Sequence, residues 1–497
     1  MRDPSRFILH CMLWLTVSGY VMPSAVAADR FEPVRQYIRE QLREQSLPSI
    51  AVAVAQDGRI VWEEGFGWAD RERRIPADAH TPYSLASISK PITTTGLMVL
   101  VRDGKLDLDR PANDYLGAAK LTARVGDANQ ATVRRVANHT AGLPLYAQFF
   151  YEDEPYRRPS MDETIRRYGN LLTAPGERYQ YSNLGYGVLD YIIERVSGKS
   201  YAEFMRKDVF LPLGMTRTSV DIGPGLETYA AARYDQEGLR IPFYDFDHPG
   251  ASAIFASAHD LARFGMFHLK NHLQDQKPIL SDALIDQMHR PSPQDGAEAY
   301  GVGFMVEDRY GYRVVSHTGG MGGVSTVMRL LPEQNIAIVV LGNAQSLLPG
   351  DTANRIAASM LPKWKIEPRG ERSDPPAFVT STELAGSWAG TVHTYERDLP
   401  ITLEFRADGQ VHATLGDQMV ALVNDPQFKD GRFTGRFAGR IGTPDTDRYR
   451  NFIQLDLALR GQKLNGAATT MRARGSQGFE ESRFRSTLGH WIELERK

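Results

Sequence analysis

The chain has 497 residues, of which 42% are hydrophobic and 24% are charged. This length favours two or three domains, and the composition is that of a globular protein, which excludes disordered, collagen-like and coiled-coil chains. Lys and Arg number 58 and Asp and Glu 60, so the net charge is −2. Because the sequence has neither a basic surplus nor a basic stripe, we expect no nucleic-acid partner.

The N-terminus has the pattern of an export signal. Arg2 and Arg6 give the start a positive charge, and a short apolar run follows them. Ala25-Val26-Ala27 is then a small-x-small cleavage site. The run is shorter than the ~20 residues of a membrane-spanning helix. We therefore predict a signal peptide at residues 1–28 and a secreted or periplasmic mature protein without a membrane span; an uncleaved anchor is the alternative. Cleavage removes Cys11, the one cysteine, and with it all disulfide and thiolate chemistry.

The first elements after the signal are a helix and a hairpin. Apolar residues at helical spacing predict a helix over residues 30–46. Two β-rich runs, Ile50–Ala55 and Arg59–Trp62, are joined by Asp57-Gly58, which is a strong hairpin signal. From about 85 to 300 the pattern is mostly helical.

A clear helix is predicted over Asn183–Val196, ending at Gly198. Strand patterns return at Tyr312–Ser316, Val324–Leu331 and Ile336–Leu341. We expect these late strands and the first hairpin to form one antiparallel sheet flanked by helices, with a helical subdomain inserted between its halves. This is an α+β catalytic domain.

The last part of the chain has a different residue pattern from the catalytic domain. Residues 362–378 hold four prolines among charges and are predicted to be a linker. Beyond it, roughly eight short alternating runs indicate a small all-β barrel or sandwich. The expected division is a catalytic domain at 29–361 and a barrel at 379–497, and we expect the two parts to fold separately.

Ser87-Ile88-Ser89-Lys90 is the first candidate for chemistry, because it places a serine and a lysine one helical turn apart. Pro91 fits a first helical turn, so Ser87 should lie at or beside the helix start. Free backbone N–H groups there would stabilise an oxyanion, and a buried Lys90 with a lowered pKa would act as a base. The pattern alone is weak, since a helix cap beside a solvated lysine also explains it.

Two further segments follow in chain order, Tyr181-Ser182-Asn183 and His317-Thr318-Gly319-Gly320. With them the sequence resembles serine β-lactamases of the class C type and the related DD-peptidases, D-aminopeptidases and esterases, whose motifs are Ser-x-x-Lys, Tyr-x-Asn, and Lys-Thr-Gly or His-x-Gly. The resemblance covers about residues 31–345. Three further segments support the resemblance: Asn138–Pro144, Pro212–Met215 and Tyr300–Gly303. It implies a β-lactamase/transpeptidase-like fold, and the C-terminal part resembles the lipocalin-like barrels appended to some members.

The resemblance also implies catalytic roles without a metal ion or organic cofactor. Ser87 is the acylated nucleophile, and Lys90 takes its proton. Tyr181 passes a proton to the leaving group and then helps to activate water. The N–H groups of Ser87 and Gly320 form the oxyanion hole. Together these groups make a complete set for acyl transfer.

The remaining motif residues are implied to bind substrate. Asn183 would hydrogen-bond the acyl side, and His317, Thr318 and Gly319 would face the far end. His317 stands where β-lactamases carry lysine, which points away from a dedicated β-lactamase. With an ordinary pKa of about 6.5 it would be mostly neutral near pH 7.5, so selectivity for carboxylate-bearing substrates should decline as the pH rises.

These observations predict an exported serine hydrolase whose leading substrates are D-amino-acid or peptidoglycan-type peptides. The alternatives are an esterase, a β-lactamase and a penicillin-binding sensor that stays acylated. The barrel would stabilise the chain, bind a ligand, cover the cleft or support a homo-oligomer. His268 and His272 are interpreted as surface histidines rather than zinc ligands. The aromatic segment from Tyr146 to Tyr156 either lines the cleft or packs as an ordinary insertion.

Overall fold

The computed structural model describes residues 29–223, 225–292, 299–367, 377–472 and 486–497. The predicted signal peptide, residues 1–28, lies outside these ranges. Within them, no helix combines the length and the apolar character that crossing a membrane requires.

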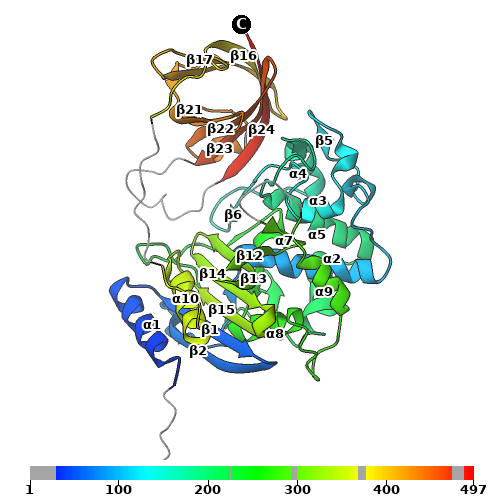
Figure 1. The fold of residues 1–497 in the computed structure, drawn as a ribbon, viewed down its shortest axis with the longest axis vertical. Helices are drawn as coiled ribbons and strands as arrows, with labels where there is room; N and C mark the ends of the chain where they lie inside the picture. Colours follow the sequence, from blue (N-terminus) through cyan, green and yellow to red (C-terminus); the bar gives the residue numbers. More distant parts are fainter. Residues whose placement is uncertain (1–28, 224, 293–298, 368–376, 473–485) are drawn as a thin grey trace, which may run out of the picture.

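A large antiparallel sheet forms the centre of the first domain (Figure 1). In spatial order its strands are β11 (Ala299–Tyr300), β12 (Met305–Arg309), β13 (Tyr312–Met321), β14 (Val324–Leu331), β15 (Ile336–Gly342), β1 (Ser49–Gln56), β2 (Arg59–Asp70) and β3 (Ile75–Pro76). Strand β1 pairs with β2 on one side and with β15 on the other. The predicted union of the first hairpin with the late strands is therefore confirmed.

Both faces of this sheet are covered by helices. Ile50, Val52 and Val54 of β1 pack in a cluster with α1 (Glu32–Glu44) and α10 (Leu348–Met360). The intervening alanines of β1 pack in the opposite cluster with α8 (Ala258–His268). Side chains of a strand alternate between the two faces, so a strand buried on both faces is apolar throughout.

A helical part lies beside the sheet around the central α2. Its helices are α2 (Ser89–Arg102), α3 (Val133–Ala137), α4 (Met161–Tyr168), α5 (Asn183–Ser197), α6 (Tyr201–Phe204), α7 (Pro249–Ser252) and α9 (Asp282–Met288). Helix α2 is buried along most of its length. A helix surrounded on all sides loses the polar stripe of a surface helix, which explains its weakly amphipathic sequence.

Small sheets lie outside the large one. One has the order β4 (Tyr83–Ser84), β10 (Ile254–Ala256) and β8 (Thr218–Val220). Two-stranded pairs form from β5 (Thr122–Ala123) with β7 (Asn170–Leu171), and from β6 (Phe150–Tyr151) with β9 (Tyr244–Asp245).

The C-terminal domain is a nearly closed barrel whose sheet contains nine strands within the described part of the chain (Figure 1). Their spatial order is β19 (Ala421–Leu422), β18 (Val411–Leu415), β17 (Asp398–Phe405), β16 (Gly386–His393), β24 (Thr487–Arg496), β23 (Lys463–Arg472), β22 (Asn451–Arg460), β21 (Arg432–Ala438) and β20 (Asn424–Lys429). The edge strands β19 and β20 are separated in sequence by Val423 alone, so the two edges meet. Trp388, Phe405 and Phe433 pack together in the interior.

The barrel contacts the helical part of the first domain. Ala147 and Thr487 exchange backbone hydrogen bonds of 2.8 and 2.9 Å, and Leu488 belongs to the main hydrophobic core of the first domain. Arg167 is paired with Asp445 at 3.0 Å. The sequence-based expectation of separate folding did not anticipate this shared interface.

The predicted linker at 362–378 also contains a core residue. Trp364 is 5% exposed, and its ring lies 5.5 Å from that of Tyr310. Phe378 at the other end packs against the barrel core. The predicted linker is thus attached to the core of each domain at these two positions, because aromatic side chains bury large apolar areas.

Candidate active site

Ser87 lies in a strained turn immediately before α2. The turn is the 3-10 helix η1 (Ala86–Ile88), and Ala86 has a φ of +49°. A non-glycine residue in this region costs about 1–2 kcal/mol, and such strain concentrates at functional sites. Leu85 N–H donates to Ile254 O at 2.9 Å and so anchors the turn to β10. The predicted position of Ser87 beside a helix start is confirmed.

Lys90 is completely buried and reaches three oxygen atoms. Its Nζ lies 3.0 Å from Ser87 Oγ, 2.8 Å from Asn183 Oδ1 and 3.1 Å from Ala251 O. Burial lowers the pKa of Lys90 well below its usual value. A neutral amine has two hydrogens and one lone pair, and the amide and backbone oxygens can only accept. In the neutral form of Lys90, the two hydrogens therefore go to Asn183 and Ala251, and the lone pair faces the hydroxyl of Ser87.

The Tyr-x-Asn segment forms the start of α5. Ser182 is the N-cap, and its Oγ accepts from Gly185 N–H at 2.9 Å. Asn183 Nδ2 donates to Tyr146 O at 2.8 Å, while its Oδ1 accepts from Lys90. A capping side chain satisfies a free N–H of the first turn, so the cap orients the next residue, Asn183, toward the lysine.

Tyr181 lies over the lysine on the side of the β13 strand. Lys90 Nζ is 4.8 Å from the centroid of the Tyr181 ring. The same ring is 4.3 Å from the ring of His139 and 6.5 Å from that of His317. The second motif therefore meets both the first and the third motif at Tyr181.

The third motif lies on the part of β13 that does not pair with β12. Strand β12 pairs with β13 only as far as Ser316, and η1 lies against the remaining part of β13. Thr318 and Gly320 are exposed, whereas His317 and Gly319 are buried. This alternation places Thr318 and Gly320 on the accessible side and turns the other two inward.

Gly319 allows β13 to approach the turn that carries Ser87. A Cβ at this position would lie 2.1 Å from Leu85 O and 2.3 Å from Thr326 Oγ1. At Gly320 a Cβ would meet nothing within 4 Å. The close backbone contact therefore requires glycine at 319 and leaves space at 320.

His317 differs from the sequence-based expectation. It is 2% exposed, its Nδ1 is 2.7 Å from Thr318 O, and its Nε2 is 2.8 Å from Tyr300 OH. Because a carbonyl only accepts, Nδ1 carries the proton and Nε2 accepts from the tyrosine. Burial, with a smaller contribution from Lys90, lowers the pKa of His317 to about 3. The expectation of an ordinary pKa near 6.5 is wrong.

Other residues of the site were not assigned a role from the sequence. His139 is buried among the rings of Tyr181, Tyr186 and Tyr300. Its Nδ1 accepts from Ser182 N–H at 3.1 Å, and burial lowers its pKa well below the usual value. His139 and Tyr300 lie in phrases that support the family resemblance, which was the available signal. Ala251 gave no signal in the sequence, because it acts through its backbone oxygen.

Three other segments match the motif patterns but lie elsewhere. Tyr449-Arg450-Asn451 in the barrel domain fits Tyr-x-Asn, and its Tyr449 OH donates to Glu154 Oε1 at 3.0 Å. Tyr168-Gly169-Asn170 also fits Tyr-x-Asn, yet Tyr168 OH donates to Asp445 at 2.7 Å. His248-Pro249-Gly250 fits His-x-Gly, and His248 Nδ1 is 2.7 Å from Asp247 Oδ1. The contact with Ser87 and Lys90, and not the pattern itself, separates the site residues from these matches.

The interpretation of His268 as a surface histidine is wrong. His268 is 1% exposed at the end of α8, and its ring nitrogens lie 3.0 Å from Thr95 Oγ1 and 3.2 Å from His289 Nε2. The helix ends before His272, which is exposed. The pair therefore does not share a helix face.

The aromatic segment contributes to both roles that were considered. Phe149 and Tyr151 pack in a cluster with Ala86 and Met321, next to the Ser87 turn and the end of β13. Tyr146 O supports Asn183, as described above. The segment thus packs as an ordinary insertion and borders the site.

Comparisons with known proteins agree with this arrangement. The family model described as Beta-lactamase matches residues 34–359. Protein flp from Staphylococcus aureus (strain MRSA252) is 25% identical over 330 residues, which cover 64% of this chain and 64% of flp. Penicillin-binding protein 4* from Bacillus subtilis (strain 168) is 27% identical over 335 residues, covering 62% of this chain and 71% of that protein.

Solved structures show the same fold. The octameric penicillin-binding protein homologue from Pyrococcus abyssi has a TM-score of 0.58 at 22% identity, covering 93% of this chain and 99% of that one. The structure of SurE with D-Leu has a TM-score of 0.62 at 22% identity, covering 92% and 99%. A class C β-lactamase from Rhodobacter sphaeroides has a TM-score of 0.57 at 20% identity, covering 66% and 98%. Since the family model spans more than half of the chain and includes the segments of Ser87, Tyr181 and His317, the chain belongs to the β-lactamase family.

Proposed function

We propose that the chain is an exported serine hydrolase that acts through an acyl-enzyme on Ser87, with peptides containing D-amino acids as its leading substrates. The observation that carries this proposal is the contact of 3.0 Å between Ser87 Oγ and the nitrogen of a completely buried Lys90. A lysine that is neutral at working pH can take the serine proton, whereas a protonated one cannot.

In the proposed first step, Ser87 Oγ attacks the substrate carbonyl carbon as its proton moves to Lys90 Nζ. The backbone N–H groups of Ser87 and Gly320 stabilise the oxyanion. The carbon–nitrogen bond then breaks, and the leaving amine takes a proton delivered by way of Tyr181. Water attacks the resulting ester in the second step and releases the acid and free Ser87. Asn183 holds Lys90, while Thr318 and Gly319 border the far end of the substrate.

The substrate class is supported by two observations. Relatives include penicillin-binding proteins, and one neighbour of the same fold was solved with D-Leu. His317 is neutral, so this position offers no cation to a substrate carboxylate, as a lysine would. This favours substrates that lack a carboxylate at that end. It disfavours β-lactams and peptides with a free C-terminal carboxylate, which a cation at this position would bind.

An esterase is the second candidate, favoured by the same neutral His317. An ester without a nearby carboxylate needs no cation at this position in order to bind. Profiling the purified mature chain against D-amino-acid amides, p-nitrophenyl esters and a chromogenic cephalosporin separates the two candidates and the β-lactamase and sensor alternatives. Rapid hydrolysis of the amides with slow hydrolysis of the cephalosporin supports the leading proposal. A single burst without turnover on every substrate supports the sensor.

Replacing Ser87 tests the nucleophile directly. Ser87→Ala should abolish covalent labelling by a fluorophosphonate and lower kcat by about 10³-fold or more. Ser89→Ala is the matched control, because Ser89 Oγ accepts from Ile254 N–H at 3.1 Å and does not reach the site. Its removal leaves a buried N–H unsatisfied, at a cost of about 1–3 kcal/mol in stability, while labelling should persist in the folded fraction. Equal loss of labelling in both variants contradicts the assignment.

The remaining proposals concern the whole protein. The domain boundaries are placed at 29–361 and 379–497, with secretion directed by residues 1–28. We also propose a homo-oligomer, because the penicillin-binding protein homologue from Pyrococcus abyssi is octameric; light scattering of the purified chain measures the oligomeric state.

A further inference from the structure

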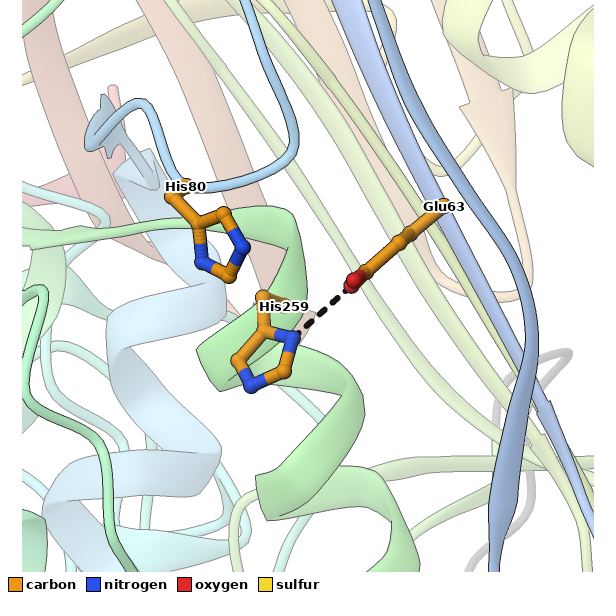
Figure 2. Close-up of side chains that lie close together, drawn as sticks. All are labelled: Glu63, His80 and His259. Carbon is orange, nitrogen blue, oxygen red and sulfur yellow. Dashed lines mark hydrogen bonds and ion pairs between the residues drawn. The ribbon is translucent and has the colours of Figure 1, made fainter.

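Glu63, His80 and His259 lie together on the surface of the first domain (Figure 2). Each offers one ligand atom, and the three atoms lie within 4.8 Å of one another. Glu63 Oε2 is 2.8 Å from His259 Nδ1, and the rings of His80 and His259 are 4.6 Å apart between centroids. None of the three contributes to the Ser87 site.

Glu63 is directed to this group by the alternation of β2. Trp62 Nε1 donates to Glu64 Oε2, and Glu64 is paired with Arg35 of α1. Glu63, between them in sequence, points to the opposite face of the strand, where it meets the start of α8. Figure 2 shows its carboxylate extending from the strand toward His259.

The two histidines are held by the loop that precedes β4. His80 N–H donates to Asp78 Oδ1 at 2.9 Å, and Thr81 Oγ1 donates to the same oxygen at 2.9 Å. His259 N–H donates to Ala79 O at 3.0 Å. The loop and the first turn of α8 are thus joined through their backbones, and this connection brings the two rings together.

We propose that Glu63, His80 and His259 form a Zn²⁺ site. Two imidazoles and one carboxylate are a donor set that Zn²⁺ accepts, leaving the fourth position to water. In tetrahedral geometry, bonds of about 2.0–2.2 Å place adjacent ligand atoms about 3.3–3.6 Å apart. Glu63 Oε2 and His259 Nδ1 are now hydrogen-bonded at 2.8 Å, and a bound ion would replace the shared proton and separate the two atoms by about a further half ångström. Rotation of the exposed His80 side chain closes the remaining distance.

The charge and exposure of the group suit a cation that enters from solvent. The Glu63 and His259 side chains are 30% and 27% exposed, and His80 is exposed. The start of α8 is the positive end of a helix dipole and opposes a cation. The carboxylate of Glu63, together with that of Asp78 beside the His80 backbone, offsets this effect.

The bound ion would connect three elements that are distant in sequence. Glu63 belongs to β2, His259 to α8, and His80 to the loop that leads through β4 to the Ser87 turn. Binding of an ion to the folded state alone stabilises that state by mass action. We therefore expect Zn²⁺ to raise the unfolding temperature of the chain, without taking part in the chemistry at Ser87.

Calorimetric titration of the untagged mature chain with Zn²⁺ at pH 7.5, after removal of bound metal by a chelator, tests the site. The wild type should bind one equivalent at the site and show a higher unfolding temperature with Zn²⁺. His80→Ala, His259→Ala and Glu63→Gln should each weaken binding by about tenfold or more, since loss of even an outer-shell partner costs about 10- to 100-fold. Titration with Co²⁺ gives a visible absorption band that the same variants should lose.

His272→Ala is the matched control, because His272 is an exposed histidine 3.1 Å from one carboxylate, Asp282, without a second imidazole. It should bind Zn²⁺ as the wild type does. His80→Ala leaves the contact of 2.8 Å between Glu63 and His259 in place, so its unfolding temperature without metal should match the wild type. Absence of binding in the wild type, or equal binding in wild type and His80→Ala, overturns the proposal.

Discussion

Burial lowers the pKa of two basic side chains within one site, Lys90 and His317. Burial is the largest cause of each shift, and the pKa of His317 is lowered further by Lys90 when the lysine is protonated. A neutral lysine is a competent base for Ser87. A neutral histidine with both nitrogens hydrogen-bonded within the protein supports the Tyr300 ring and does not present a charge to the substrate.

This environment changes the expected pH dependence at His317. A pKa of about 3 places its charge change below the range from pH 5.5 to 8. The ratio of kcat/KM for an anionic and a neutral substrate with the same acyl group should therefore stay constant within about twofold over that range. The ratio cancels the contribution of the other ionisable groups of the site to the absolute rates.

His317→Gln is the control for this measurement, because glutamine is neutral and can both donate and accept. It should give the same flat ratio as the wild type. A wild-type ratio that falls about tenfold as the pH rises would show instead that His317 is protonated at the lower pH and binds the substrate carboxylate.

At the scale of elements, the site depends on how closely β13 approaches η1. Thr326 Oγ1 of β14 donates to Leu85 O at 2.9 Å, and Gly319 lies against the same carbonyl. The strand edge and the nucleophile turn are therefore held together by one backbone oxygen. Their separation determines whether the N–H groups of Ser87 and Gly320 can face one substrate oxygen.

Alanine at the two neighbouring glycines tests this contact. Gly319→Ala places a Cβ 2.1 Å from Leu85 O, so β13 must move and acylation should slow by about 10²-fold or more, as on loss of an oxyanion donor. Gly320→Ala meets nothing within 4 Å and keeps its N–H, so it should acylate at close to the wild-type rate. The rate of fluorophosphonate labelling measures both. Similar rates for the two variants would show that the close approach is not required.

At the scale of the whole molecule, the barrel supports the segment that carries the site. The Arg448 side chain is 3% exposed; it donates to Phe149 O at 2.7 Å and pairs with Glu154 at 3.0 Å. Both partners lie in the aromatic segment, which also supplies Tyr146 O to Asn183. The barrel is thus connected to Asn183 through one loop.

A chain ending at Glu367 should therefore unfold at a lower denaturant concentration than the complete mature chain. It loses Leu488 from the main core and Trp491 from its cluster with Leu172, and burial of each such side chain contributes about 1.5–3 kcal/mol. Circular dichroism in urea measures the two midpoints. Arg448→Met in the complete chain is the milder comparison and should lower the midpoint by a smaller amount. Equal midpoints for the truncated and complete chains would contradict this prediction and would show that the first domain folds independently of the barrel.

The sequence by itself determined the main elements of the fold and the three motif segments. The Ile50–Ala55 run, the Asp57-Gly58 turn and the helix from Asn183 carry local patterns that depend on neighbouring residues alone. Ser87, Lys90, Tyr181 and His317 were found because residue type and chain order are properties of the sequence. The union of the first hairpin and the late strands in one antiparallel sheet was predicted from the late apolar runs, whereas the order of the strands came from the structure.

Only the tertiary structure decided the electrostatics of the site and the contacts between distant segments. The low pKa of His317 comes from burial beside Tyr300, and the direction of the Lys90 lone pair depends on the Ala251 carbonyl. Neither partner is near in sequence. The same holds for the choice between Tyr181 and Tyr168, and for Glu63, His80 and His259, which meet only because β2, a loop and α8 pack together. Desolvation and coordination depend on distances in space, which local sequence patterns do not contain.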